Sequence, residues 1–60
     1  MQNYIAKIKG HQSIIFLAND IKDALEWANY LKEKLYGKCE LTELWTGGKR
    51  VFYQVDLEEV

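Results

Sequence analysis

The sequence predicts one α+β domain over residues 1–60, in which four strands and one helix follow each other as ββαββ. Two apolar segments precede one long amphipathic segment, two alternating segments follow it, and glycines separate the segments of each pair. The composition, 48% hydrophobic and 28% charged with no proline, excludes a disordered or low-complexity chain. We therefore expect a mainly antiparallel four-stranded sheet, in the order 2-1-3-4, with the helix on one face.

The first two strands are expected at Asn3–Lys9 and Gln12–Ala18. Gly10-His11 between them fits a two-residue type II′ turn, which favours glycine at its first central position. Side chains alternate between the two faces of a strand, so this turn fixes which of them lie together. It predicts one face with Tyr4, Ala6, Ile8, Ile15 and Leu17, and the other with Ile5, Lys7, Ile14 and Phe16.

The helix is expected to begin after Asn19 or Asp20, either of which can cap the free amides of the first turn. Gly37 is suited to end it, because glycine readily adopts the left-handed conformation that closes many helices. Apolar residues between these ends follow the spacing of one buried helix face. That face is predicted to comprise Ile21, Ala24, Leu25, Ala28, Leu31 and Leu35.

The third and fourth strands are expected at Lys38–Trp45 and Lys49–Leu57, joined by a primed turn at Gly47-Gly48. This turn predicts one face with Thr42, Leu44, Val51, Tyr53 and Val55. The opposite face then holds Cys39, Leu41, Trp45 and Phe52, beside Glu43, Arg50 and Gln54.

A single helix covers only one face of such a sheet, and we assign it to the face that holds Leu17 and Tyr53. The other face is then left uncovered, with a contiguous apolar patch of the kind that marks an interaction site. A chain of this length buries only about 60% of its extended surface, which favours a homodimer as a source of further core. The interaction residues predicted for the dimer or a partner are Ile5, Ile14, Phe16, Leu41, Trp45, Arg50 and Phe52. The alternative is that a bent hairpin, a longer turn or the C-terminal tail covers this face.

The sequence indicates no enzyme, no metal site and no cofactor. Cys39 and His11 are the single pair that could form a nucleophile and its base, and no motif surrounds either residue. With one cysteine and one histidine there is no thiolate and imidazole set for a metal. Gly47-Gly48 is not part of a phosphate-binding loop, because the pattern Gly-x-x-x-x-Gly-Lys-Ser/Thr does not occur there.

Binding of single-stranded nucleic acid is the main alternative to protein binding. Lys7, Lys9, Lys49 and Arg50 would contact phosphates, beside aromatic side chains on which bases could stack. The net charge of −1 and the isoelectric point near 5.7 argue against it.

In size and layout, though not in any motif, the chain looks like many small proteins of phages and mobile elements. That resemblance implies binding to a host protein, as an inhibitor or adaptor, or sequestering a small molecule in a dimer pocket. We expect a non-enzymatic protein-interaction module that is cytoplasmic, because no apolar run approaches the roughly 20 residues needed to span a bilayer.

Overall fold

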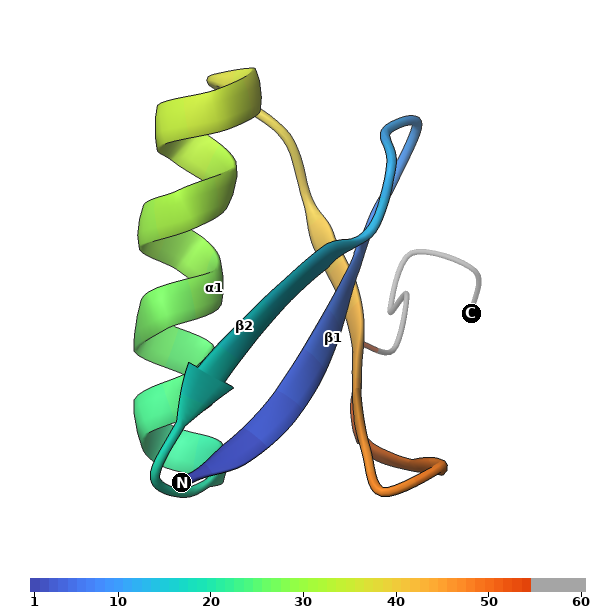
Figure 1. The fold of residues 1–60 in the computed structure, drawn as a ribbon. Helices are drawn as coiled ribbons and strands as arrows, with labels where there is room; N and C mark the ends of the chain where they lie inside the picture. Colours follow the sequence, from blue (N-terminus) through green and yellow to red (C-terminus); the bar gives the residue numbers. More distant parts are fainter. Residues whose placement is uncertain (55–60) are drawn as a thin grey trace.

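Four short strands and one helix form the fold in a computed structural model that describes residues 1–54 (Figure 1). They occur in the order β1 (Gln2–Ile8), β2 (Ile14–Ala18), α1 (Ile21–Tyr36), β3 (Leu41–Thr46) and β4 (Lys49–Tyr53). The sheet has the order β2-β1-β3-β4, and every neighbouring pair is antiparallel. The predicted ββαββ fold and strand order are confirmed. The part of the fourth strand predicted at 55–57 lies outside the described residues.

Both helix ends are formed by the residues that the sequence indicates. The carboxylate of Asp20 accepts a hydrogen bond of 2.8 Å from the Asp23 amide, and the Asp23 carboxylate accepts one of 2.9 Å from the Asn19 amide. These bonds satisfy amides that have no partner within the helix. At the other end Gly37 has a φ of 78°, and its amide donates to the carbonyl of Glu33.

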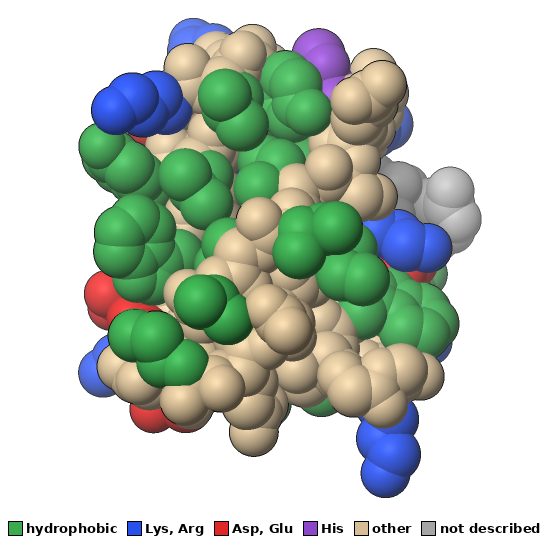
Figure 2. All heavy atoms as spheres, in the orientation of Figure 1, with side chains coloured by type: hydrophobic (Ala, Val, Ile, Leu, Met, Phe, Trp, Pro, Cys, Tyr) green, Lys and Arg blue, Asp and Glu red, His purple; other side chains and the backbone are tan. Residues whose placement is uncertain are grey.

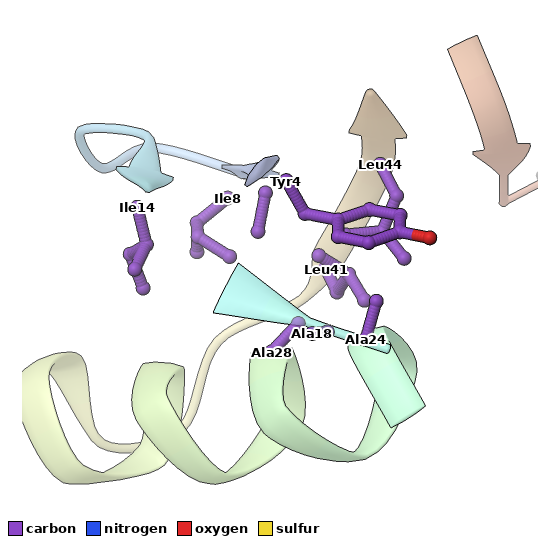
Figure 3. Close-up of a cluster of buried hydrophobic side chains, with 9 residues drawn as sticks. Tyr4, Ile8, Ile14, Ala18, Ala24, Ala28, Leu41 and Leu44 are labelled. Carbon is purple, nitrogen blue, oxygen red and sulfur yellow. The ribbon is translucent and has the colours of Figure 1, made fainter. Parts of the chain in front are cut away.

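Helix α1 stands against one face of the sheet, mainly over β2 and with further contacts to β3 and β1 (Figure 1). Figure 3 shows side chains of the strands pointing toward the helix to form the core. The buried core comprises Tyr4, Ala6, Ile8, Ile14, Ala18, Ala24, Ala28, Leu41 and Leu44. Four of these nine are alanines, and Leu44 is the largest fully buried side chain of the described residues. Small side chains therefore make up nearly half of the buried core.

The first hairpin differs from the expected register by one residue. Tyr4 pairs with Phe16, and Ala6 pairs with Ile14, whereas a two-residue turn at Gly10-His11 would pair each of them one position further along β2. The chain turns instead through a β-turn closed by the His11 amide and the Ile8 carbonyl, with Gly10 at φ 76°, followed by Gln12 and Ser13, which belong to neither strand. A shift of one residue exchanges the two faces of a strand.

The face assignment of β2 is therefore wrong. Ile14 is 8% exposed and belongs to the core, and Phe16 packs against it. Ile15 and Leu17, which were expected beneath the helix, are instead 70% and 54% exposed on the opposite face. All five residues of this strand are apolar, so its composition does not reveal which side is buried.

The second hairpin has the predicted turn, with positive φ at Gly47 and Gly48, but a bulge follows it. Trp45 pairs with Arg50, whereas Leu44 pairs with Phe52, so Val51 is the additional residue. Such an insertion reverses the side chains beyond it. Phe52 consequently packs against the core, and the expectation that it lies on the uncovered face is wrong.

A second irregularity, between β1 and β3, has the same effect on Leu41. Lys7 pairs with Glu43 but Ile8 pairs with Leu41, which leaves Thr42 as the additional residue. Leu41 is 5% exposed and faces the helix, so its assignment to the uncovered face is also wrong.

The buried helix face matches the prediction at its centre and departs from it at its ends. Ala24 and Ala28 are fully buried, and Leu25 and Leu31 pack against the core. Ile21 and Leu35, predicted on the same face, are 43% and 61% exposed. The helix therefore presents one apolar side chain to solvent near each of its ends.

Candidate interaction surface

The sheet face turned away from α1 carries a row of side chains that crosses all four strands. Ile15 lies opposite Ile5, Ile5 opposite Trp45, and Trp45 opposite Arg50. Directly paired residues of neighbouring strands project on the same side of a sheet. The row therefore passes from an apolar end at β2 to a charged end at β4.

Two shorter rows flank the first. Lys7 lies opposite Glu43, which lies opposite Tyr53. Leu17 lies opposite Asn3. We call the whole surface the open face, and its residues are Asn3, Ile5, Lys7, Ile15, Leu17, Glu43, Trp45, Arg50 and Tyr53. Its apolar half comprises the aliphatic side chains on β1 and β2, and its polar half comprises the charged and aromatic side chains on β3 and β4.

Glu43 links two side chains of the polar half. Its Oε1 accepts a hydrogen bond of 2.7 Å from Nε1 of Trp45, and its Oε2 lies 3.7 Å from Nη1 of Arg50. The Glu43 side chain is 22% exposed, against 47% for Arg50. The carboxylate therefore holds the indole nitrogen by a hydrogen bond and partly offsets the charge of the neighbouring guanidinium.

Cations lie over both aromatic rings of the open face. Nζ of Lys7 is 5.1 Å from the centre of the Trp45 ring, and the guanidinium carbon of Arg50 is 4.4 Å from that of Tyr53. Contacts of this kind are worth about 0.5–1 kcal/mol at exposed sites. They limit the conformations of four long side chains before any partner binds.

A shallow hollow of about 540 Å³ lies at the end of the open face nearest the Gly47-Gly48 turn. Its walls are mostly apolar, and the side chains that line it include Ile5, Ile15, Trp45 and Lys7. A hollow of this depth fits a protruding side chain of a protein partner better than an enclosed small molecule, because ligand sites usually bury most of the ligand surface.

Of the seven interaction residues predicted from the sequence, Ile5, Trp45 and Arg50 are brought together on the open face. The other four, Ile14, Phe16, Leu41 and Phe52, face the helix. Sequence reasoning missed Ile15, Leu17 and Tyr53 because the shifted register and the bulge exchange faces. No local signal in the apolar segment Ile14–Ala18 would have revealed the shift.

The composition of the open face, with Trp45, Tyr53 and Arg50 beside aliphatic residues, is typical of the centres of protein interfaces. Comparison with protein-family models, with curated proteins and with solved structures found no match to this chain. The chemistry of the surface therefore carries the functional interpretation.

The four basic residues considered for nucleic-acid contacts are only partly brought together. Lys7 and Arg50 lie on the open face, on either side of Glu43. Lys9 lies 3.8 Å from the Glu40 carboxylate, beyond the end of β1. Lys49 pairs with Thr46 beside the glycine turn. Two of the four cations thus have an acidic partner, which weakens their attraction for phosphates.

Cys39 and His11 have separate surroundings. The His11 ring stacks on Tyr36, with 4.3 Å between ring centres, whereas the Cys39 thiol lies 3.5 Å from the Gly37 carbonyl. Residues 1–54 contain no cluster of three or more side chains suited to hold a metal ion. Helix α1 is not long and apolar enough to cross a membrane, and it is the one helix in that part of the chain.

Proposed function

We propose that this protein is a non-enzymatic protein-interaction module that binds a larger protein through the open face and acts as a homodimer. The observation that carries the proposal is the row formed by Ile15, Ile5, Trp45 and Arg50 across the sheet. It places aliphatic, aromatic and guanidinium groups side by side on a surface that α1 does not cover. In this role the protein would serve as an inhibitor or an adaptor.

The charges of the open face indicate which chemical groups a partner surface would present. Glu43 is held by Trp45 and Arg50 within the protein, while the Lys7 amine lies over an aromatic ring beside the apolar half. A complementary surface would present an apolar projection to the hollow near Trp45 and a carboxylate to Lys7. Buried aromatic anchors of this kind usually contribute the largest share of binding energy.

Nucleic-acid binding through the same face is the competing proposal, and the pairing of Arg50 and Lys9 with carboxylates speaks against it. The two differ in their response to salt. A complex with a single-stranded nucleic acid weakens steeply as salt increases, whereas an apolar protein interface changes little.

The test is affinity capture from a nuclease-treated lysate at two salt concentrations, with the wild type, Trp45→Ala and Lys22→Ala. Lys22 is a surface residue of α1 and serves as the control. We expect a stoichiometric protein to be captured by the wild type and by Lys22→Ala, and lost by at least about tenfold with Trp45→Ala.

A labelled single-stranded oligonucleotide provides the second measurement. Micromolar, salt-sensitive binding of this probe, together with no Trp45-dependent capture of protein, would replace the proposal by nucleic-acid binding. Capture that is equal for all three proteins would contradict the role of the open face.

A further inference from the structure

Strand β2 forms one edge of the sheet and has a strand neighbour on one side, β1, within the described residues. Its sequence, Ile14–Ala18, contains no charged residue and no proline. Proteins usually protect such an edge with lysine, proline, a bulge or a covering element, because its free amides and carbonyls can pair with another strand. No bulge interrupts the register of β2.

Apolar side chains border this edge on the open face. Ile15 is 70% exposed and Leu17 is 54% exposed. They continue the apolar half of the open face up to the edge itself, so the molecule becomes more apolar toward β2.

Apolar side chains also border the edge on the helix side. Trp27, Leu31 and Leu35 are spaced by four residues and so form one ridge of α1. Trp27 is 45% exposed and Leu35 is 61% exposed, while Leu31 packs partly on the core. Lys22, on the opposite flank of the helix, lines a hollow together with Val51 of β4. The ridge therefore lies on the β2 side.

Figure 1 shows β2 in front of β1 and β3, and Figure 2 shows, in the same orientation, hydrophobic side chains along the helix side and toward the right of the molecule, with tan atoms between them. Exposed apolar groups thus occur on both sides of an unprotected strand edge. A second strand paired with this edge would cover apolar side chains on the open face and on the helix side.

We propose that β2 pairs antiparallel with β2 of a second copy of this chain, so that two four-stranded sheets join into one of eight strands. The register that pairs the whole strand is centred on Phe16. In it Ile15 of each copy lies opposite Leu17 of the other, and Ile14 lies opposite Ala18. This inference rests on the proposed function for its homodimer and adds the contact that builds it.

A second copy fits this edge because the edge is complementary to itself. An antiparallel β2 pair brings apolar residues opposite apolar residues throughout and leaves no charge without a partner. Since α1 lies mainly over β2, the two helices would run side by side and cover the ridges of Trp27, Leu31 and Leu35. This contact would enlarge the small, alanine-rich core of each chain.

The pairing also leaves the polar half of each open face accessible. The apolar halves of the two copies would join into one stripe at the centre of the long sheet. Trp45 and Arg50 would lie toward both ends, where each could bind its own partner molecule.

The test is the dimer dissociation constant of the purified full chain, measured by analytical ultracentrifugation. In Ile15→Lys/Leu17→Lys, each new lysine faces a new lysine of the other copy, and we expect the constant to increase roughly 100-fold. In Ile15→Lys/Leu17→Glu, the new groups have opposite charges across the pair, and we expect at least about a tenfold recovery relative to the double lysine variant.

Tyr53→Lys is the control, because it adds a lysine to the open face at the other edge of the sheet, away from β2. It should leave the dissociation constant unchanged. A dimer that is dissociated by Tyr53→Lys and unaffected by the double lysine variant would be stacked through the open face, which would overturn edge pairing. A wild type that is monomeric at its highest soluble concentration would overturn it as well.

Trp27 supplies an independent readout. In a Trp45→Phe variant it is the one remaining tryptophan, since the chain contains two. Dilution should shift its emission to longer wavelength as the helix ridges separate. In the double lysine background the emission should be red-shifted at every concentration. An emission maximum that does not depend on dilution, in a protein that dimerises, would contradict this contact.

Dimerisation is measured without a partner, which separates the two proposals. A wild-type dimer that captures no protein would contradict the proposed function alone. A monomer whose capture depends on Trp45 would contradict edge pairing and the homodimer, and it would support partner binding through the open face.

Discussion

The indole nitrogen of Trp45 donates a hydrogen bond of 2.7 Å to the carboxylate of Glu43, two residues earlier on the same strand. Because side chains alternate along a strand, both lie on the open face. The bond satisfies the polar atom of a large aromatic residue and restricts the conformations of its ring. It therefore connects the local geometry of β3 to the proposed binding surface.

Substitution of Glu43 should separate this hydrogen bond from the ion pair with Arg50. Glu43→Gln keeps an oxygen acceptor for the indole and should change the free energy of unfolding by less than about 0.5 kcal/mol, since the ion pair is half exposed. Glu43→Ala removes the acceptor and should lower it by about 1 kcal/mol. Urea denaturation followed by Trp45 emission in a Trp27→Phe background measures both. Equal effects of the two variants would show that the hydrogen bond contributes nothing.

The bulge at Val51 predicts opposite results for two adjacent residues of β4. Phe52→Glu would bring a charge against the core and should lower the free energy of unfolding by about 2 kcal/mol or more. Tyr53→Glu lies on the open face, where Tyr53 is 53% exposed, and should cost less than about 1 kcal/mol. Urea denaturation of both variants checks the register. The reverse order would mean that β4 pairs with β3 without the bulge.

Asp20 should be the main determinant of the helix start. Asp20→Ala removes the acceptor for the Asp23 amide and should lower the free energy of unfolding by about 1 kcal/mol. Asp20→Asn retains an acceptor oxygen and should remain close to the wild type. Thermal unfolding followed by circular dichroism tests the pair. An equal loss in both would indicate that the charge matters more than the hydrogen bond.

Gly48 should be sensitive to substitution for a reason that involves no contact. Its φ is 78°, and apart from Gly48 and its two chain neighbours no residue has an atom within 4 Å of the position that a Cβ would occupy. Gly48→Ala should therefore cost about 1 kcal/mol through backbone strain alone. Gly48→Asn should cost less, since asparagine tolerates this conformation better. Chemical denaturation of the two variants measures the difference. A neutral Gly48→Ala would contradict a turn with positive φ at this position.

The sequence by itself determined the elements, their order and the ends of the helix. These features depend on interactions within a few residues: the Asp20 carboxylate reaches the first turn of its own helix, Gly37 permits a positive φ, and Gly47-Gly48 closes a two-residue turn. The strand order follows from the same elements, because short connections between two hairpins and one helix leave few arrangements. Ile5, Trp45 and Arg50 were assigned to the uncovered face on this basis.

Only the tertiary structure decided which side of each strand is buried. The faces of β2 depend on one residue in the Gly10–Ser13 connection, and those of Phe52 and Leu41 depend on one bulge each. The sequence permits both registers, because a shift by one residue exchanges side chains of similar character. Residues 14 and 15 are both isoleucine, and Phe52 and Tyr53 differ by one hydroxyl group. The observed register places Ile14 and Leu41 in one buried cluster with Ala24 and Ala28 of α1, and it packs Phe16 against that cluster, so burial against the helix favours it. A preference that arises between distant segments leaves no trace in the local pattern of either.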